Sequence, residues 1–323
     1  MIKYNIPPLF SVEKQLDTSP EAFGFLHPTE VSLATDGNAL RARLEEDGYL
    51  YLPGLLDREL VHEARMSVLE RAQQEGLLDP TQPLEDGIIR ENLKPYLKPA
   101  YAEDNAPLMR VLYGEDQAMM RLFREFFGAP IRHFDFTWMR VIGSGKGTAP
   151  HCDMVFMGRG THDLLTAWTP MGDIPLSLGG LIILENSHRL TPVAFNDYLK
   201  SDVDAYCANG PNAENIKEGK FRWEHYDGSL REWTGDITDD PVALREKLGG
   251  RWLTAEEYRM GDVLIFTMKT IHASIDNQTR ALRLSTDTRY QRADEPVDER
   301  WVKGPDGTAP VGHSFAGKQG RIC

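Results

Sequence analysis

The chain has 323 residues, 41% of them hydrophobic, and can therefore bury a substantial core. Its 49 acidic and 36 basic residues give a formal net charge of -13, which disfavours nucleic acids and anionic membrane surfaces as partners. We expect a cytoplasmic protein, because there is no basic and apolar leader, no apolar run of about 18 residues and no CxxC pair.

The first third of the chain is predicted to be mostly helical. Its first 30 or so residues contain several prolines and no sustained period, which predicts an irregular arm over the surface. Beyond this arm, apolar residues recur every three or four positions in segments that are followed by glycines. The helices predicted in this way cover residues 38–46, 57–75 and 116–127, and a strand is expected at 49–52.

Strands dominate from about residue 131, where the apolar period changes to two. The predicted strands include 131–139, 165–169, 180–184, 262–268 and 281–291. Their spacing is typical of a sandwich or barrel. The glycine-rich stretch 143–147 lacks the ending and the following helix of a phosphate-binding loop, so we interpret it as a flexible turn.

A long insertion lies between His188 and Gly261. It is rich in Asp, Asn and Gly, and its aromatic residues include Tyr206, Phe221, Trp223, Tyr226, Trp233 and Trp252. Connections of this length are usually functional, and so many solvated aromatic side chains would be costly. We therefore predict a lid over 191–258; the alternative is a surface elaboration that packs on its own aromatic residues.

The stretch from Ala149 to Phe156 contains a candidate metal-ligand pair. His151 and Asp153 stand two residues apart, so in an extended segment their side chains leave the same side of the backbone. A single His-x-Asp occurs by chance in many proteins, and one imidazole with one carboxylate cannot hold a catalytic metal. The prediction therefore requires a third ligand.

His272 is the candidate for this third ligand, because it lies where an apolar strand that begins at Gly261 leaves the core. The next strand carries Arg283 on a face of charged and hydroxyl side chains, opposite an apolar face. A buried guanidinium has to be paired, so this face suits a cavity that holds an anion.

Two histidines and one carboxylate form the facial triad that holds Fe(II) and leaves three positions open. A 2-oxo acid can take two of these positions and dioxygen the third, while Arg283 binds the far carboxylate of the co-substrate. A second His-x-Asp, His133 with Asp135, lies inside a regular alternating run, and we interpret it as a structural pair. For His188 a capping or surface role is expected.

Several short motifs stand in a fixed order along the chain. They are Asp47-Gly-Tyr-Leu-Tyr-Leu-Pro-Gly-Leu-Leu56, His151-Cys-Asp153, Ala167-Trp-Thr169, Met171-Gly-Asp173, Gly179-Gly-Leu181, Ser187-His188, Gly261-Asp-Val-Leu-Ile-Phe266 and His272-Ala-Ser274 with Arg283. Over about residues 40–292, their order and spacing resemble the phytanoyl-CoA dioxygenase family of Fe(II)/2-oxoglutarate-dependent oxygenases.

This resemblance implies a double-stranded β-helix, which is a cupin-like jelly roll. His151, Asp153 and His272 match the iron ligands of the family, and Arg283 matches the clamp on the 2-oxoglutarate carboxylate. Trp168 and Ser274 match positions that line the co-substrate pocket, and Ser285 lies on the same strand face as Arg283.

The sequence differs from the family's frequent residues at Cys152, Phe156 and Glu185-Asn186, none of which belongs to the triad. Phe156 stands where a tyrosine is often found and removes a hydroxyl from the pocket mouth. The carboxylate of Asp153 argues against halogenation, because the related halogenases have a small residue at that position.

The predicted architecture is a mainly β oxygenase domain over residues 1–323. A mostly helical layer at 1–130 precedes a jelly-roll core at 131–292, which contains the lid at 191–258, and a tail follows at 293–323. The predicted reaction uses Fe(II), 2-oxoglutarate and O2 to hydroxylate an unactivated C–H bond of a small organic substrate, releasing succinate and CO2.

Two alternatives stay open at this point. One is a catalytically silent metal-binding jelly-roll module, and the other is a cupin-type metal enzyme that does not use 2-oxoglutarate. The lack of a basic cluster disfavours a CoA thioester as substrate, although Lys217, Lys220 and Arg222 could contact its phosphates.

Overall fold

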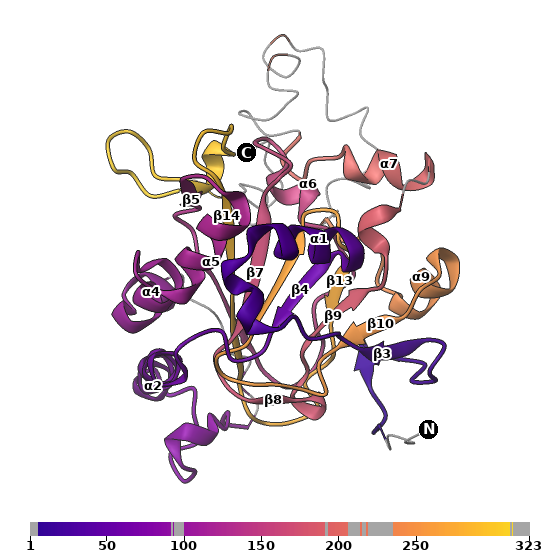
Figure 1. Ribbon diagram of the computed structural model, residues 1–323. Coiled ribbons are helices and arrows are strands. Elements are labelled where there is room, and N and C mark those ends of the chain that lie inside the picture. Colours follow the sequence, from indigo (N-terminus) through magenta and orange to yellow (C-terminus); the bar gives the residue numbers. More distant parts are fainter. Residues whose placement is uncertain are drawn as a thin grey trace.

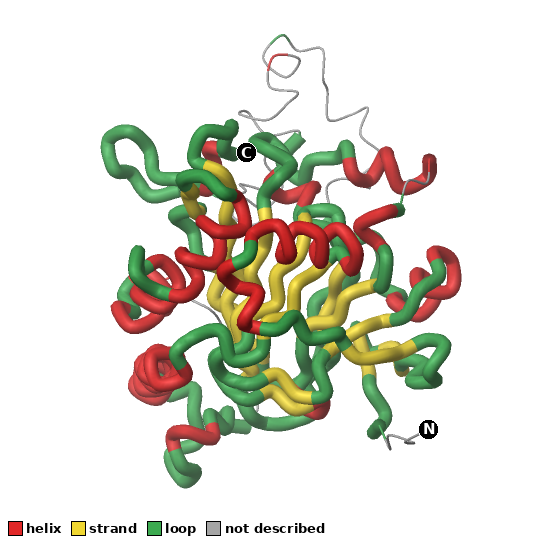
Figure 2. The backbone as a smooth tube through the Cα atoms, in the orientation of Figure 1, coloured by secondary structure: helices red, strands yellow, loops and turns green. Residues whose placement is uncertain are grey.

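Figure 1 and Figure 2 show the computed structural model, which describes residues 6–91, 93, 100–190, 193–205, 214, 218, 235–310 and 312. Most of the strands belong to two sheets that pack against each other. In the described part of the chain, no helix is long and apolar enough to cross a membrane. The middle of the predicted lid lies outside the described residues.

The larger sheet has six antiparallel strands, five of them in the order β4-β12-β7-β14-β5, with β6 also paired to β14. These strands are β4 (Tyr49–Leu52), β5 (Ile131–His133), β6 (Trp138–Ile142), β7 (Leu165–Pro170), β12 (Val263–Thr267) and β14 (Arg283–Arg292). The predicted run 131–139 is thus two strands, and its residues 134–137 form an irregular break between them.

The second sheet has the order β13-β9-β10-β3, in which only β10 and β3 are parallel. Its strands are β3 (Phe23–Phe25), β9 (Leu181–Leu184), β10 (Trp252–Thr254) and β13 (His272–Ser274). Two short pairs complete the β structure, β1 (Phe10–Ser11) with β2 (Lys14–Gln15) and β8 (Ile174–Pro175) with β11 (Glu257–Tyr258). The mainly β jelly roll predicted from the sequence is confirmed.

Side-chain alternation divides the larger sheet into two faces. Val263 and Ile265 of β12 pack in the cluster that also contains the N-terminal helices, whereas Leu264 and Phe266 pack against the second sheet. On β14 the apolar Leu284 joins the helical side. The opposite, inner face of β14 carries Arg283, Asp287 and Arg289, so the period of two directs these charges toward the space between the sheets.

Helices cover the outer face of the larger sheet. Figure 1 shows α1 crossing in front of β4, with α2 and α4 along one side. The α-helices are α1 (Gly37–Asp47), α2 (Arg58–Gln74), α3 (Ala100–Glu103), α4 (Ala106–Tyr113), α5 (Ala118–Phe127), α6 (Met154–Met157), α7 (Val193–Leu199) and α9 (Pro241–Leu248). The 3-10 helices are η1 (Val31–Thr35), η2 (Leu84–Asp86), η3 (Leu176–Leu178), η4 (Ser187–Arg189) and η6 (Glu299–Trp301).

The predicted helix ends have physical causes. Asp57 accepts hydrogen bonds from the backbone N–H groups of Glu59 and Leu60 at the start of α2, which is the expected N-cap. Gly48 and Gly128 adopt left-handed backbone conformations at the ends of α1 and α5, where a side chain would be strained.

The structure differs from two predictions about these segments. The N-terminal arm is not merely a surface segment, because Leu9 and Phe23 are buried and β3 pairs with β10. The lid cannot extend to residue 258, because β10 and β11 belong to the sheets. The last strand of the core, β14, ends at Arg292, and Trp301 in the segment that follows is buried among aromatic residues.

Phe123 provides a test of the helix–sheet packing. It is fully buried on α5 and stacks on Tyr290 of β14 with ring centroids 4.1 Å apart. We expect Phe123→Ala to lower the free energy of unfolding by about 3–5 kcal/mol, measured by chemical denaturation, because it leaves a cavity. Val31→Ala, at an exposed position, should change it by no more than about 0.5 kcal/mol. Equal effects would contradict this packing.

Candidate active site

His151, Asp153 and His272 converge in the interior. Each is buried, and one ligand atom from each lies within 4.8 Å of the others. The two histidines are held side by side because their backbones form an antiparallel bridge, in which each N–H donates to the other residue's carbonyl at 3.0 Å. This bridge connects the 149–156 segment to β13.

Asp153 reaches the cluster in a way that the sequence did not predict. The segment is not extended at this residue, whose φ of -66° and ψ of -21° are helical, and Asp153 is the N-cap of α6. The turn into α6, rather than strand alternation, therefore brings His151 and Asp153 together. Cys152 between them is fully buried, and its Sγ lies 3.2 Å from the carbonyl oxygen of Lys269.

Backbone carbonyl groups orient both imidazoles. Nδ1 of His151 lies 2.8 Å from the carbonyl oxygen of Ala149, and Nδ1 of His272 lies 3.0 Å from that of Thr270. Since a carbonyl can only accept, each Nδ1 carries a hydrogen, and in a neutral ring Nε2 then keeps its lone pair for a metal. Burial and the neighbouring His151 lower the pKa of His272 to about 4, so its ring is neutral at pH 7.

The Asp153 carboxylate has one oxygen engaged by protein donors. Its Oδ2 accepts from Nη2 of Arg289 at 2.9 Å and from the hydroxyl of Thr166. Its Oδ1 instead faces Nε2 of His272, 3.9 Å away. Burial alone would raise the pKa of Asp153, but Arg289 and the two imidazoles lower it below the ordinary value, so this group is ionised.

This donor set fits a divalent iron ion. Two neutral imidazole nitrogens and one carboxylate oxygen are the ligands of the facial triad of non-haem Fe(II) oxygenases. The hydrogen bonds to the far side of each ligand are the outer-shell contacts that fix ligand orientation. His151, Asp153 and His272 would hold the ion through Nε2, Oδ1 and Nε2.

Arg283 lies beside this cluster with unpaired donors. Its side chain is buried, and within the described part of the chain neither Nε nor Nη1 has an acceptor. Burial lowers its pKa to about 10 while Asp287 opposes the shift, so Arg283 is charged at pH 7. Unpaired buried donors are costly, and a carboxylate from 2-oxoglutarate would satisfy them.

The remaining predicted pocket residues lie around Arg283. Trp168 and Ser274 line the same cavity of about 20 Å³, together with His151 and His272. The Ser274 hydroxyl oxygen accepts from the Thr148 backbone N–H at 2.7 Å, which leaves its hydrogen available for donation. Ser285 does not line this cavity; its hydroxyl is buried and has no partner among the described residues.

A larger cavity of about 240 Å³ adjoins the other side of His151 and Asp153. Its lining combines aromatic and charged side chains. The lining residues are Trp138, Arg140, Thr148, His151, Asp153, Phe156, Met157, Asp236, Arg289 and Trp301. Such a mixture suits an organic substrate with an apolar body.

Sequence reasoning missed several of these residues. Arg289 lay on the polar face of the predicted strand but received no role, and its guanidinium carbon lies 4.5 Å from the centre of the Trp138 ring. Thr166 and Trp301 carried no signal, because their roles depend on contacts between distant segments.

The other histidines lie away from the cluster where they are described. His133 stacks on Tyr113 with centroids 4.0 Å apart, and Asp135 accepts from the Lys303 backbone N–H, which agrees with a structural pair. His188 contacts the carbonyl oxygen of Glu45. His225 and His313 lie outside the described residues.

Comparisons with known proteins give consistent results. The phytanoyl-CoA dioxygenase (PhyH) family profile matches residues 44–285. The chain is 27% identical to a 1-deoxypentalenic acid 11-beta-hydroxylase from Streptomyces exfoliatus, over 81% of this chain and 83% of that protein. The corresponding enzyme from Streptomyces arenae is 26% identical over the same shares.

Solved structures with the same fold include two from nogalamycin biosynthesis. The carbocyclase SnoK has a TM-score of 0.52 and 18% identity, covering 87% of this chain and 91% of that one. The epimerase SnoN, in complex with Fe3+, alpha ketoglutarate and nogalamycin RO, has a TM-score of 0.51 and 20% identity, covering 86% and 96%. EctD from S. alaskensis with bound Fe has a TM-score of 0.51 and 16% identity, covering 92% and 90%.

The triad can be tested by metal binding. We expect His151→Ala and His272→Ala each to weaken Fe(II) binding by more than about a hundredfold, because loss of a ligand should exceed the loss of an outer-shell contact. Anaerobic calorimetry measures the affinity. His188→Ala removes a histidine outside the cluster and should bind Fe(II) like the parent protein. Full metal occupancy in both ligand variants would refute the triad.

The hydroxyl of Thr166 can be tested separately. Thr166→Val keeps the side-chain shape but removes the donor to Asp153 Oδ2, so we expect Fe(II) affinity to fall by about 10–100-fold. Thr169→Val is the matched control, because Thr169 is equally buried on the same strand and its hydroxyl has no partner in the described structure. Indistinguishable Fe(II) affinities in the two variants would show that the Thr166 contact does not orient the ligand.

Proposed function

The chain belongs to the phytanoyl-CoA dioxygenase family of Fe(II)/2-oxoglutarate-dependent oxygenases, and we propose that it hydroxylates an unactivated C–H bond of a compact organic substrate. The observation that carries this proposal is the buried His151, Asp153 and His272 cluster beside the unpaired donors of Arg283. The cluster supplies a metal site, and Arg283 supplies the anion site that 2-oxoglutarate requires.

The proposed roles follow from the contacts. His151, Asp153 and His272 hold Fe(II), and Arg283 fixes the far carboxylate of 2-oxoglutarate in a buried position. When bound, iron and 2-oxoglutarate supply the oxidation, in which one O2 converts 2-oxoglutarate to succinate and CO2 and inserts one oxygen atom into the substrate C–H bond. Ser274 and Ser285 are the nearby hydroxyl donors for the co-substrate.

The larger cavity is the proposed substrate site. Phe156 contacts the His151 ring edge-on, with centroids 5.6 Å apart, so the apolar wall begins beside the metal ligands. Trp138 and Trp301 continue this wall, with centroids 4.6 Å apart. These rings exclude water from the reacting C–H bond and limit how the substrate can lie. A volume of about 240 Å³ favours a compact substrate body.

Hydroxylation is the outcome supported by the relatives. Both curated relatives are hydroxylases of an organic acid, whereas the more distant structural neighbours are evidence for the fold alone. The retained Asp153 carboxylate opposes halogenation, as the sequence predicted. The cytoplasmic location and the lid over the substrate stay predictions.

The proposed co-substrate site is tested with Arg283→Ala. Losing the guanidinium removes a buried, charged hydrogen-bonding partner, so we expect 2-oxoglutarate affinity to fall by roughly a hundredfold or more. Anaerobic calorimetry on the Fe(II)-loaded protein measures it, and Fe(II) affinity should stay unchanged. The control Arg280→Ala replaces a half-exposed arginine elsewhere and should keep 2-oxoglutarate binding.

Unchanged 2-oxoglutarate affinity in Arg283→Ala would favour a metal enzyme that does not use this co-substrate.

The alternative of a catalytically silent binding module is tested by measuring turnover. The parent protein with Fe(II), ascorbate, O2 and 2-oxoglutarate should form succinate faster when 1-deoxypentalenic acid or another compact acid is added. Persistent absence of succinate would support the silent module.

A further inference from the structure

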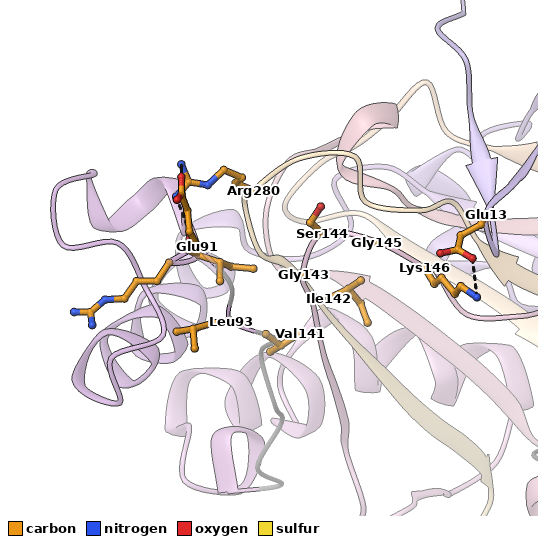
Figure 3. A pocket seen from close by; sticks show the side chains of 12 residues that line it. Glu13, Glu91, Leu93, Val141, Ile142, Gly143, Ser144, Gly145, Lys146 and Arg280 are labelled. Atoms are coloured by element: carbon orange, nitrogen blue, oxygen red, sulfur yellow. Dashed lines mark hydrogen bonds and ion pairs between the residues drawn. The ribbon is translucent and has the colours of Figure 1, made fainter.

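Basic side chains line two regions of the structure, an open groove and the cavities beside the metal-ligand cluster. The larger is an open groove of about 700 Å³, shown in Figure 3, which contains Lys146 and Arg280. Lys146 pairs with Glu13 at 2.8 Å, and Arg280 lies 3.5 Å from Asp79. Arg90, the third basic residue of the groove, donates to the carbonyl oxygen of Leu78. All three lie on an open surface where ion pairs are weak, so the groove offers no strong anion site.

Arg140 also has an ion-pair partner, Asp287, but it differs from the groove residues in its place beside the metal-ligand cluster. It lies on β6 opposite Ser285 of β14, and its side chain lines both the small cavity around Arg283 and the 240 Å³ cavity. Its position is therefore between the proposed co-substrate site and the proposed substrate site. His151 and Thr148 line the same two cavities, which places Arg140 close to the reacting end of the substrate.

One edge of the Arg140 guanidinium is fixed by the protein. Its Nε donates to Oδ2 of Asp287 at 2.6 Å, and the Asp287 side chain is only 9% exposed. This bond sets the plane of the guanidinium. Among the described residues, neither Nη atom of Arg140 has an acceptor, although its side chain remains 35% exposed. The two Nη donors are thus both oriented and accessible.

The other charged groups on the cavity are already engaged. Arg289 donates to Asp153 through Nη2, and its remaining Nε and Nη1 are sealed from solvent. Asp236 also lines the cavity and has an interaction partner of its own. An anionic group entering the cavity would therefore meet the Nη donors of Arg140, whose Nε pairs with Asp287, while the charge of Arg289 is paired with Asp153.

We propose that Arg140 is an anion receptor for the substrate, which is a carboxylic acid with a compact apolar body. Two parallel N–H donors of a guanidinium match the two oxygens of a carboxylate. The aromatic wall of Trp138, Phe156 and Trp301 receives the apolar body. This inference rests on the proposed function for the location of the reacting site, while the anion site itself rests on the contacts of Arg140.

Binding of matched compounds tests the proposal. The probes are cyclohexanecarboxylate, 1-naphthoate and adamantane-1-carboxylate, each compared with its uncharged carboxamide. Calorimetry is performed anaerobically on the Fe(II) protein saturated with 2-oxoglutarate. The acid that fits best should bind about tenfold or more tightly than its amide, because a charge-assisted bidentate contact is lost in the amide.

The variant Arg140→Gln removes the charge and retains a donor that can reach Asp287. We expect it to abolish the preference for acid over amide, and Arg140→Lys to restore part of it. The Arg280→Gln control on the other groove should behave like the parent protein. Because the readout is binding, a protein that binds acids but forms no succinate would contradict the proposed function and leave the anion site supported.

Several results would overturn the proposal. They are equal binding of acids and amides by the parent protein, a preference that survives in Arg140→Gln, and the absence of binding by every acid. A fall in 2-oxoglutarate affinity in Arg140→Gln, at least as large as the change in acid binding, would assign Arg140 to the co-substrate site instead. If cyclohexylphosphonate binds more tightly than the acid, the anionic group of the substrate is a phosphonate-type anion and not a carboxylate.

Discussion

Charge buried on the inner face of β14 is the constraint on which the rest of the site depends. Arg283, Asp287 and Arg289 alternate along this strand, and each is more than nine-tenths buried. An ionised group in such surroundings loses several kcal/mol of hydration, which only well-placed partners can offset. Asp153 accepts a hydrogen bond from Arg289, and Asp287 accepts one from Arg140. Arg283 keeps unpaired donors, which are available to the co-substrate.

Strand register supplies these partners. Arg289 lies opposite Thr166 in β7, so both side chains leave the same face and reach the same oxygen of Asp153. Asp287 lies opposite Trp168 in β7 and Trp138 in β6. A slip of one residue between β14 and its neighbours would turn every one of these side chains toward the helices. The register that packs the apolar face of the sheet against α2, α4 and α5 therefore also keeps the metal ligands oriented.

The sequence allowed the strands and the triad to be predicted, because both leave local patterns. Alternation placed Arg283, Asp287 and Arg289 on one face of a strand, and the motif order linked His272 to His151. Cross-strand partners leave no such pattern: nothing near Thr166 indicates that it faces Arg289. The same reason explains the misplaced lid end and the unforeseen burial of Trp301, since Trp252 and Trp301 become core residues only through contacts with distant segments.

Asp287 connects the two anion sites through a single carboxylate. It accepts from Nε of Arg140, and its charge opposes the fall in the pKa of Arg283. Two guanidinium groups around one carboxylate leave one positive charge in excess, and this is costly at Arg283, whose side chain is buried. A carboxylate at either arginine reduces it. Because Arg283 lines the small cavity and Arg140 borders both cavities, one buried aspartate fixes the arginine proposed for the substrate through a hydrogen bond and adds negative potential at the arginine proposed for the co-substrate.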